Sequence, residues 1–593
     1  MPVLASKPRS AEWTLRLPAV TAADAPELAI AQRGCHRLAL SGSATWVDRD
    51  RSQEIEPARL LDAFLASGDA ALSRLRGHFS LAIWDVFSGE ALLVRDPMGR
   101  YPLFYARRSD DILLSGSVAA LARSAAVPSS LNASVFAEYF CGQWTTLDET
   151  YYANIYRVPP GCVVRFRHGS RRVFRYWNPE SGGNWATPQE LAQFEQRLED
   201  AVAQPLEQGP SAIFLSGGLD SVAVAAIAAE RCRQHGHPVP RALSLAFPDA
   251  AVNEEPIQRG VASSLSLPQD MFLFDRALNE HSLVEEGLEL SAQMPQPLDN
   301  IWLPAYRCLF ERAHQLGCSA ILTGTGGDEW LGISPLLSAD LIRQGDWDGF
   351  LMLWRALTRS NGPNLALRRN LLWRHGLRPI LREHAMKAVH FAAPALLLRK
   401  RERRILASIP HWAAPDPAVR RRIVERTLAA EDARARTGSY YGDDLRESLD
   451  HPLVSMEAEE HFDSGRRFGV PLAHPFLDDR LVDLLYRVSP RHLMAGGRTK
   501  GLVRQTLARR FPGLGFERQR KVDARRFAAA RIYRSAPGAL ARLGGVRTLH
   551  DMGVVSSAKA AQFVGCSVQS GNEREAWRVW SILNLETWAR NRW

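Results

Sequence analysis

Ser216-Gly-Gly-Leu-Asp-Ser221 decides the fold of the larger part of this chain. It directly follows the apolar run Ala212–Leu215, which predicts a buried strand, and it opens an alanine-rich segment that predicts a helix from Ser221 to Gln234. Two glycines at such a junction let the backbone approach an anion closely, and the helix N-terminus adds the positive end of its dipole. The spacing is not that of a Walker loop. We therefore predict that an anion is bound by Ser216, Gly217, Gly218, Asp220 and Ser221.

A second glycine-rich loop, Gly324-Thr-Gly-Gly-Asp-Glu329, follows the apolar run Ala320–Thr323. Another apolar run, Ala242–Phe247, lies between the two loops along the chain. Apolar strands that alternate with helices are typical of a parallel sheet, and such sheets bind ligands at the carboxyl ends of their strands. Gly324 and Gly326 would then line the same crevice as the first loop, and Asp220 and Asp328 would offer Mg²⁺ a pair of oxygen ligands. The alternative is a turn with a helix-capping Asp328.

Domain organisation follows from the change in pattern along the chain. Up to about residue 177, short apolar runs separated by Gly, Asp and Pro predict strands. The segment 179–188 has the composition of a linker, so we place one domain at 1–180 and a second at 185–593. From about residue 340 onward the pattern is largely helical. The fold class is therefore α/β, with a strand-rich N-terminal domain and a parallel-sheet domain that has a helical extension.

Composition excludes several classes of protein. Of the 593 residues, 46% are hydrophobic and 23% are charged, which is typical of a globular chain and not of a disordered one. The apolar run 391–398 is too short to span a membrane, and the first residues lack the pattern of a signal peptide, so we expect a cytoplasmic protein. The seven cysteines include no C-x-x-C pair, which predicts reduced core residues and neither disulfides nor zinc ligands.

The net charge of +10 has a local origin. Between Asp340 and Thr437 there are 20 Lys and Arg against 9 Asp and Glu, so the helical region 340–440 is strongly basic. Such a surface suits an acidic peptide, an anionic lipid or a nucleic acid, or is simply a solvated helical face. No zinc finger, RNA-binding sheet or basic heptad region accompanies the charge, so we do not expect a nucleic-acid partner.

Together the two loops resemble those of the asparagine synthetase superfamily of AMP-forming enzymes. Further segments of the chain are similar to motifs of the same enzymes: Arg76–Asp85, Arg95–Tyr105, Pro475–Asp478, Gly497–Lys500 and Arg520–Lys521. The resemblance implies an N-terminal glutaminase-like domain, which is an α+β sandwich of the N-terminal-nucleophile type, and an ATP pyrophosphatase-type synthetase domain that uses ATP and Mg²⁺. It also implies that Leu243, Ser244 and Leu245 line the adenine pocket. Lys500, Lys521 and Arg504 would offset charge on the transition state and on the leaving pyrophosphate.

The N-terminal domain departs from this family pattern. Glutaminases of the family use a cysteine at position 2, whereas this chain has Pro2, which carries no nucleophile. Ser41–Thr45 lies roughly where those enzymes have the Asn-Gly-Glu that holds glutamine. We therefore predict that this domain is a scaffold that releases no ammonia.

The synthetase site departs as well. Where asparagine synthetases carry Glu and β-lactam synthetases carry Tyr, this chain has Thr325. In the family's E-x-R-x-P-F-L-D motif, the Glu and Arg positions are occupied by Pro471 and Ala473. A free peptide amine, with a pKa of about 8, needs less help from a base than an amide N–H does. Both departures point away from the two named synthetases.

A third branch, the lasso-peptide macrolactam cyclases, resembles this chain more. That resemblance implies adenylation of an Asp or Glu side chain of a precursor peptide, followed by attack of the peptide's own N-terminal amine to form an isopeptide bond. It also implies a leader-peptide protease or recognition partner. Two alternatives remain: an amide-forming synthetase for a small carboxylate, and an inert binding subunit, against which both intact loops argue. The segment His451–His461, rich in Glu, predicts a helix that either faces the substrate or forms an amphipathic surface.

Overall fold

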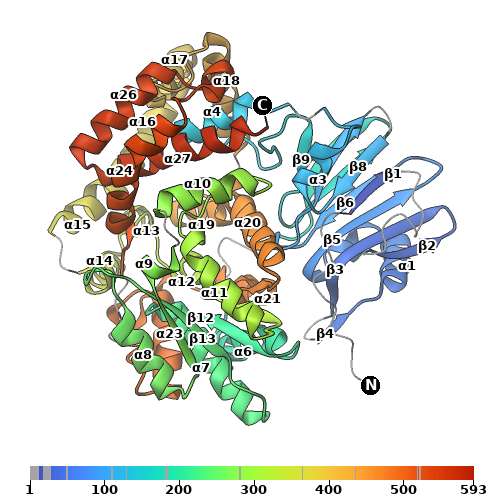
Figure 1. Cartoon of the computed structure of the whole chain (residues 1–593), viewed down its shortest axis with the longest axis vertical. Helices are drawn as coiled ribbons and strands as arrows, with labels where there is room; N and C mark the ends of the chain where they lie inside the picture. Colours follow the sequence, from blue (N-terminus) through green and yellow to red (C-terminus); the bar gives the residue numbers. More distant parts are fainter. Residues whose placement is uncertain are drawn as a thin grey trace.

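Two antiparallel sheets stack face to face to form the N-terminal domain (Figure 1). The computed structural model describes residues 13–17, 28–48, 51–108, 111–128, 130–179, 185–278, 282–362, 365–434, 436–516, 519 and 522–592. The smaller sheet has the strand order β1 (Thr14–Leu17), β8 (Asp111–Ser115), β7 (Phe104–Arg108), β9 (Ile155–Arg157). The larger has the order β11 (Ser170–Arg175), β10 (Cys162–Arg167), β6 (Ala91–Arg95), β5 (Leu75–Asp85), β3 (His36–Asp48), β2 (Ala29–Arg33), with β4 (Arg51–Glu54) paired to β3.

Apolar side chains from both sheets fill the space between them, with Trp84, Tyr105 and Phe166 among the buried residues. On its other face the larger sheet packs against α1 (Pro57–Ser67), followed by α2 (Asp69–Leu72). The smaller sheet is covered by α3 (Val118–Arg123), and α4 (Ala133–Cys141) continues towards the second domain. This layered arrangement confirms the predicted α+β sandwich.

The second domain is built on a parallel sheet with the order β14 (Gln269–Leu273), β13 (Arg241–Ala246), β12 (Ser211–Phe214), β15 (Ala320–Leu322), β16 (Leu472–Ala473). All four strand pairs are parallel. One face packs against α6 (Phe194–Leu206), which follows α5 (Pro188–Ala192), and against α7 (Leu219–Gln234) and α8 (Glu255–Ser264). The other face packs against α10 (Leu283–Gln293) and α11 (Leu303–Gln315). The predicted parallel sheet between helices is therefore confirmed.

The chain after β15 is mostly helical, as the sequence predicts. The remaining elements are α9 (Phe274–Ala277), α12 (Gly327–Leu331), α13 (Leu337–Gln344), α14 (Trp347–Asn361), α15 (Leu365–Arg369), a π-helix (Asn370–Leu377), α16 (Arg378–Ala392), α17 (Pro394–Ser408), α18 (Pro417–Ala433), α19 (Tyr440–Asp450), α20 (Pro452–Phe468), a 3-10 turn (Pro475–Leu477), α21 (Asp479–Leu485), α22 (Pro490–Leu493), a 3-10 turn (Ala495–Gly497), α23 (Gly501–Arg510), α24 (Arg525–Arg542), α25 (Thr548–Asp551), α26 (Ser557–Ser570) and α27 (Glu573–Arg590). Figure 1 shows α24, α26 and α27 beside α16, α17 and α18, on the far side of α10 from β12.

A buried ion-pair network joins the two domains. Glu459 on α20 accepts hydrogen bonds from Arg95 and Arg157, each at 2.9 Å, and from Gln296 at 2.6 Å. The side chains of Arg95, Arg157 and Glu459 are at most 2% exposed. The segment His451–His461 begins α20, as a helix was predicted there, and the face that carries Glu459 is an interdomain surface, which neither sequence alternative included.

The cysteines follow the prediction only in part. All seven are free, but only Cys141, Cys162 and Cys232 are buried, and Cys566 is exposed on α26. Cys566 therefore corrects the expectation that all of them lie in the core. Within the described ranges, no helix is long and apolar enough to cross a membrane.

Candidate active site

The topology of the parallel sheet places both glycine-rich loops at one crevice. From the central strand β12 the chain first adds β13 and β14 on one side, then returns to add β15 and β16 on the other. Such a reversal of strand order separates the loops that leave adjacent strands and opens a crevice at their carboxyl ends. Asp220 follows β12 and Asp328 follows β15, so the loops predicted from sequence meet at this switch point.

Short hydrogen bonds shape the first loop. The Oγ atoms of Ser216 and Ser221 lie 2.8 Å apart, and the N–H of Gly218 donates to Ser216 Oγ at 3.1 Å. The N–H of Gly217 donates to a carboxylate oxygen of Glu254 at 3.1 Å. Burial raises the pKa of Glu254, while this N–H opposes the rise. An amide of the loop thus already binds an anionic oxygen, the chemistry that a phosphate requires.

Glycine is required where the two loops touch. A Cβ on Gly324 would lie 2.6 Å from the backbone nitrogen of Ser221, and a Cβ on Gly327 would lie 2.3 Å from Cγ of Asp220. Gly326 has a φ of +95°, which favours glycine, and its Cβ would collide with Leu477. The second loop therefore lies directly against the aspartate of the first.

Lys500 holds the two predicted aspartates at one point. Its Nζ lies 2.5 Å from Oδ2 of Asp220 and 2.7 Å from Oδ1 of Asp328. Burial opposes the charge on this lysine, but the two carboxylates outweigh it and raise the pKa of Lys500, so the side chain stays cationic. Lys500 also has a φ of +60°, a conformation that costs energy for a side chain other than glycine. Such strain is typical of functional positions.

These donors fit a magnesium ion bound to phosphates. Two carboxylates that converge within 3 Å of one cation offer the hard oxygen ligands that Mg²⁺ prefers, and Lys500 would neutralise phosphate oxygens beside them. Asp220 and Asp328 would hold the ion, as the sequence predicts, and the ion would shield the charge of the phosphates.

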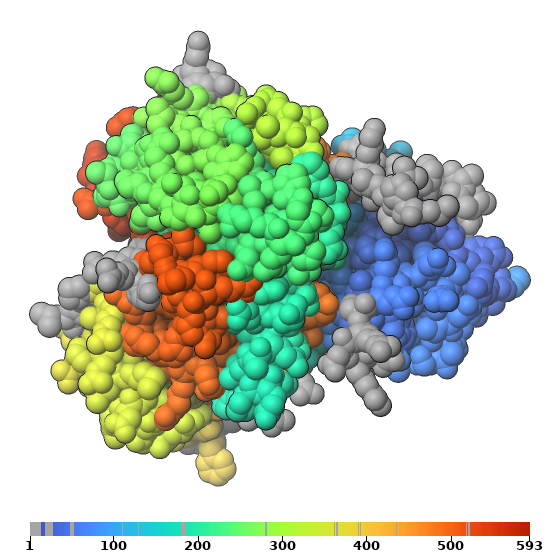
Figure 2. Space-filling model, turned by 90° about the horizontal axis from the view of Figure 1, so that it is seen from below, coloured from blue at the N-terminus to red at the C-terminus, as the bar shows by residue number. Residues whose placement is uncertain are grey.

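Helix α14 of the basic region positions the loop that carries Lys500. Ser360, which is 7% exposed, accepts hydrogen bonds at 3.0 Å from both the N–H and the hydroxyl of Thr499. Arg498 donates to the carbonyl of Arg359 at 2.6 Å. Figure 2 shows the yellow helices of this region against the orange segment that contains α23. Sequence reasoning missed Ser360, because nothing in its local pattern indicates a partner 139 positions away.

Arg504 bonds the protein backbone, and its predicted role towards phosphate stays a prediction. Its guanidinium donates to the backbone carbonyls of Thr499 at 2.9 Å, of Gln519 at 3.0 Å and of Phe516. The side-chain amide of Gln519 in turn donates to the carbonyl of Gly217. Arg504 thus ties Phe516 and Gln519 to the Lys500 loop, and its donors point to the protein backbone. Lys521 lies outside the described residues.

The residues predicted to line the adenine pocket are on β13. Leu243 and Leu245 are buried in the core that α10 and α11 cover. Ser244 faces the opposite way and donates its hydroxyl to the carbonyl of Leu215 at 2.9 Å. These side chains therefore pack inside the layers around the parallel sheet. That they line an adenine pocket stays a prediction.

Carboxylates lie near Thr325, which stands where related synthetases have the Glu or Tyr of their site. Thr325 is held by Thr323, whose hydroxyl lies 2.6 Å from Nδ1 of His474. Nearby, burial raises the pKa of Glu329, and the charge of Glu457 raises it further. Burial likewise raises the pKa of Glu457 itself. Glu457 is nevertheless half exposed, so solvent reaches its carboxylate.

The start of the smaller sheet offers no nucleophilic thiol. Trp13 precedes β1, is 7% exposed, and accepts a hydrogen bond at its carbonyl from Ser115 at 2.6 Å. The next residue, Thr14, begins β1 and is exposed. Cys141 and Cys162 are buried, and burial raises the pKa of both thiols, which leaves them inert.

Comparison with known proteins agrees with this α/β fold and its paired glycine loops. The asparagine synthase family matches residues 193–590, and the glutamine amidotransferase domain matches residues 55–177. The chain belongs to the asparagine synthase family, which uses ATP.

Individual relatives are distant. Asparagine synthetase [glutamine-hydrolyzing] 3 of Bacillus subtilis is 27% identical over 30% of this chain and 29% of its own length. Amidase chry2 of Gibberella zeae is 25% identical over 47% of this chain and 43% of its own. Asparagine synthetase [glutamine-hydrolyzing] 2 of Bacillus subtilis is 26% identical over 46% and 38%. The chain thus spans less than half the length of these curated relatives.

Proposed function

We propose that this protein is an AMP-forming carbon–nitrogen ligase that closes an isopeptide ring in a lasso-type precursor peptide. An oxygen of an Asp or Glu side chain of the peptide attacks the α-phosphorus of ATP and expels pyrophosphate. The peptide's N-terminal nitrogen then attacks the acyl carbon, loses a proton and expels AMP. The observation that carries the proposal is the convergence of Asp220 and Asp328 on Lys500 between two interlocked glycine loops.

The residues of the crevice have three roles: phosphate binding, charge stabilisation and positioning. The loop from Ser216 to Ser221 holds the phosphates by its amides and hydroxyls, and Lys500 stabilises the charge that develops on the leaving pyrophosphate. Arg504 and Ser360 are positioning residues that keep the Lys500 loop in place. Lys521 is assigned to pyrophosphate by the motif that it shares with the family.

Two features support an amine that comes from the substrate and not from glutamine. The residues at the start of β1 are Trp13 and Thr14, so this part of the N-terminal domain has no thiolate with which to release ammonia. Glu329 and Glu457 lie beside the crevice with raised pKa values, and a carboxylate of this kind attracts a cationic amine and accepts its proton. We assign to them the role of the base that Thr325 and Pro471 do not supply.

The helical region supports a peptide-sized substrate. Of the fifteen large apolar side chains that are exposed among the described residues, nine lie between residues 347 and 406, within the basic region: Trp347, Leu351, Leu372, Trp373, Leu381, Phe391, Leu396, Leu398 and Leu406. Exposed apolar groups among Arg and Lys side chains suit an acidic, partly apolar peptide. Because α14 of this region holds the Lys500 loop, peptide bound there would lie next to the activating chemistry.

The test uses the purified full chain with ATP, Mg²⁺ and a linear peptide that has a free N-terminus and an acidic residue several positions along. Mass spectrometry should show loss of one water, with one AMP released for each ring. Acetylation of the same peptide at its N-terminus should abolish ring closure, and changing its acidic residue to the amide should abolish both products. Ring formation without AMP, or with the acetylated peptide, would contradict the proposal.

A second function is favoured by the similarity to asparagine synthetases. In this case the enzyme would join ammonia or an amine to a small carboxylate. AMP release that requires a small acid and ammonia, with every peptide left unchanged, would decide for this alternative.

A further inference from the structure

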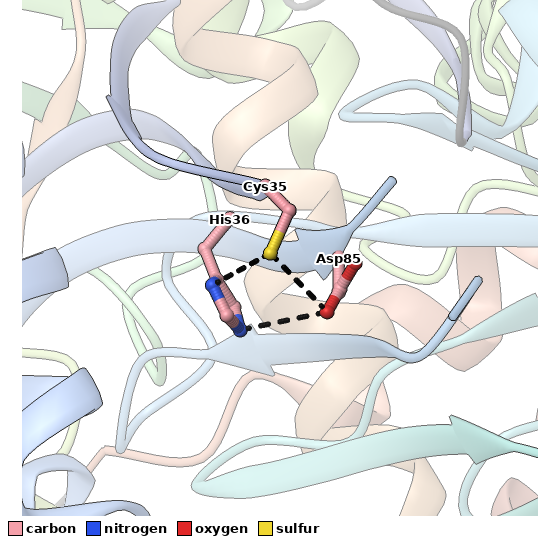
Figure 3. Close-up of side chains that lie close together, drawn as sticks. All are labelled: Cys35, His36 and Asp85. Atoms are coloured by element: carbon pink, nitrogen blue, oxygen red, sulfur yellow. Dashed lines mark hydrogen bonds and ion pairs between the residues drawn. The ribbon is translucent and has the colours of Figure 1, made fainter. Parts of the chain in front are cut away.

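A thiol, an imidazole and a carboxylate meet at one end of the larger N-terminal sheet (Figure 3). Cys35 Sγ lies 3.4 Å from Nδ1 of His36 and 3.6 Å from Oδ2 of Asp85, and Nε2 of His36 lies 3.7 Å from the same Oδ2. Among the described residues, this is the one group of three Cys, His, Asp or Glu side chains close enough to share a metal ion. The sequence did not indicate it, because Asp85 is fifty positions from Cys35.

The backbone fixes all three residues. Gly34, with a φ of +57°, and Cys35 form the two-residue turn between β2 and β3, since Arg33 pairs with His36 across that turn. His36 is also paired directly with Asp85 in the ladder between β3 and β5. The N–H of Val86 donates to the carbonyl of Cys35 at 3.1 Å, which ties the turn to the end of β5. The three side chains therefore project from rigid, mutually bonded positions.

The carboxylate is oriented so that one oxygen is left for the cluster. Oδ1 of Asp85 accepts the N–H groups of Phe87 at 2.8 Å and Ser88 at 3.2 Å, which leaves Oδ2 facing the thiol and the ring. These amides are also the largest cause that lowers the pKa of Asp85, so it is a carboxylate at neutral pH. Hydrogen bonds that fix a ligand in this way are typical of metal sites.

The two separations measured from the sulfur match those around a tetrahedral zinc ion that takes Nδ1 of His36 as its nitrogen ligand, and one ligand atom from each residue lies within 4.8 Å of the others. Bonds of about 2.3 Å to sulfur and about 2.0–2.2 Å to nitrogen or oxygen put neighbouring ligand atoms about 3.4–3.6 Å apart. The observed distances from Cys35 Sγ are 3.4 Å and 3.6 Å. All three side chains are partly exposed, so solvent reaches the site and water can supply a fourth ligand.

We propose that Cys35, His36 and Asp85 form a zinc-binding site with a solvent-derived fourth ligand. The site is separate from the synthetase crevice. The N–H of Gly77, near the start of β5, donates to Asp479 of the second domain at 2.8 Å, whereas Asp85 lies eight residues further along the strand, or about 26 Å. Zinc there would cross-link the β2–β3 turn to the end of β5, at the outer end of the sheet.

Cobalt provides the direct test, because a thiolate bound to Co²⁺ gives a charge-transfer absorption that oxygen ligands do not. The full chain is reduced, stripped with a chelator and titrated with Co²⁺. We expect the absorption to saturate at one equivalent and to disappear when Zn²⁺ is added. Cys35→Ser should abolish the absorption, whereas Cys566→Ser, which removes the exposed thiol on α26, should leave it intact.

Two further measurements keep the assignment falsifiable if Cys35→Ser does not fold. Asp85→Asn should retain the thiolate absorption but weaken zinc affinity, measured by competition with a chromophoric chelator, by at least about tenfold. Zinc should also raise the Tm of the wild-type chain, since it binds the folded state. Absence of a thiolate absorption in the wild type, or its retention in Cys35→Ser, would overturn the proposal.

Discussion

The two domains use their family motifs in opposite ways. In the synthetase domain, Asp220 and Asp328 converge on Lys500 at a solvent-accessible crevice. In the N-terminal domain, the motif residue Arg95 is fully buried and bonded to Glu459. Its neighbour Asp96 accepts hydrogen bonds from the N–H groups of Arg100 and Tyr101, at 3.0 and 2.8 Å.

This difference teaches that motif residues of one family can serve the architecture in one domain and a charged site in the other. The N-terminal motif residues are occupied with the domain interface and with a tight turn, and neither use requires a nucleophile. The synthetase motif residues carry strain and buried charge, which a purely structural segment has no reason to keep. The comparison predicts loss of stability from one set of residues and loss of chemistry from the other.

Glu459→Gln should show the largest effect, on stability. Removing one partner of a buried ion pair leaves Arg95 and Arg157 uncompensated, which costs about 3–5 kcal/mol. Burial tends to raise the pKa of Glu459, but the two arginines outweigh it and lower the pKa, so the residue is charged at neutral pH. Denaturant unfolding should show the loss, while Glu289→Gln, which changes an exposed side chain of α10, should leave the free energy of unfolding unchanged. Equal stability in both variants would mean that the network does not hold the domains together.

Lys500→Gln should leave the protein folded and reduce AMP formation. A single cation or donor aimed at developing charge is worth about 10²–10³-fold in kcat. Lys559→Gln, on the exposed surface of α26, removes the same charge away from both the crevice and the basic region and should turn over normally. Wild-type kcat in Lys500→Gln would remove this lysine from the proposed mechanism.

The sequence predicted the strand-rich N-terminal domain, the parallel sheet and the meeting of the two glycine loops, because apolar runs and glycine pairs are local signals. Long-range partners had no such signal. Arg504 was assigned to phosphate from its motif, yet its guanidinium donates three hydrogen bonds to backbone carbonyls up to fifteen positions away. Ser360 and Glu459 act through contacts with Thr499 and Arg95, which only the folded chain brings together.

Ser360→Ala tests whether the basic helical region takes part in the chemistry of the synthetase domain. Loss of two hydrogen bonds to Thr499 should loosen the Lys500 loop. A hydrogen bond is worth about 0.5–1.5 kcal/mol, so kcat should fall about threefold to tenfold with little change in KM for ATP. The matched control is Thr358→Ala on the same helix, whose hydroxyl bonds only the carbonyl of Trp354 among the contacts described. An equal effect of both substitutions would indicate general weakening of α14.

The smallest effect concerns an acidic pair at the edge of the crevice. Glu460 accepts the N–H groups of Asp299 and Asn300 at 2.5 and 3.1 Å, and its carboxylate lies near that of Asp299. Burial and this mutual repulsion raise the pKa of Glu460, while burial and the charge of Glu457 raise the pKa of Asp299.

Because the folded state holds protons that the unfolded state has released, the free energy of unfolding should fall as pH rises from about 4.5 through the raised pKa values. Asp299→Asn removes one charge, so it should flatten this decline and raise Tm at pH 8 more than at pH 5. The atoms packed around Asp299 raise its pKa, but its side chain keeps contact with solvent, and screening by that solvent should hold the gain below about 1 kcal/mol. Glu207→Gln, which removes an exposed carboxylate at the end of α6, should give no such pH dependence. A gain that is equal at both pH values would mean that Asp299 and Glu460 do not share their protons.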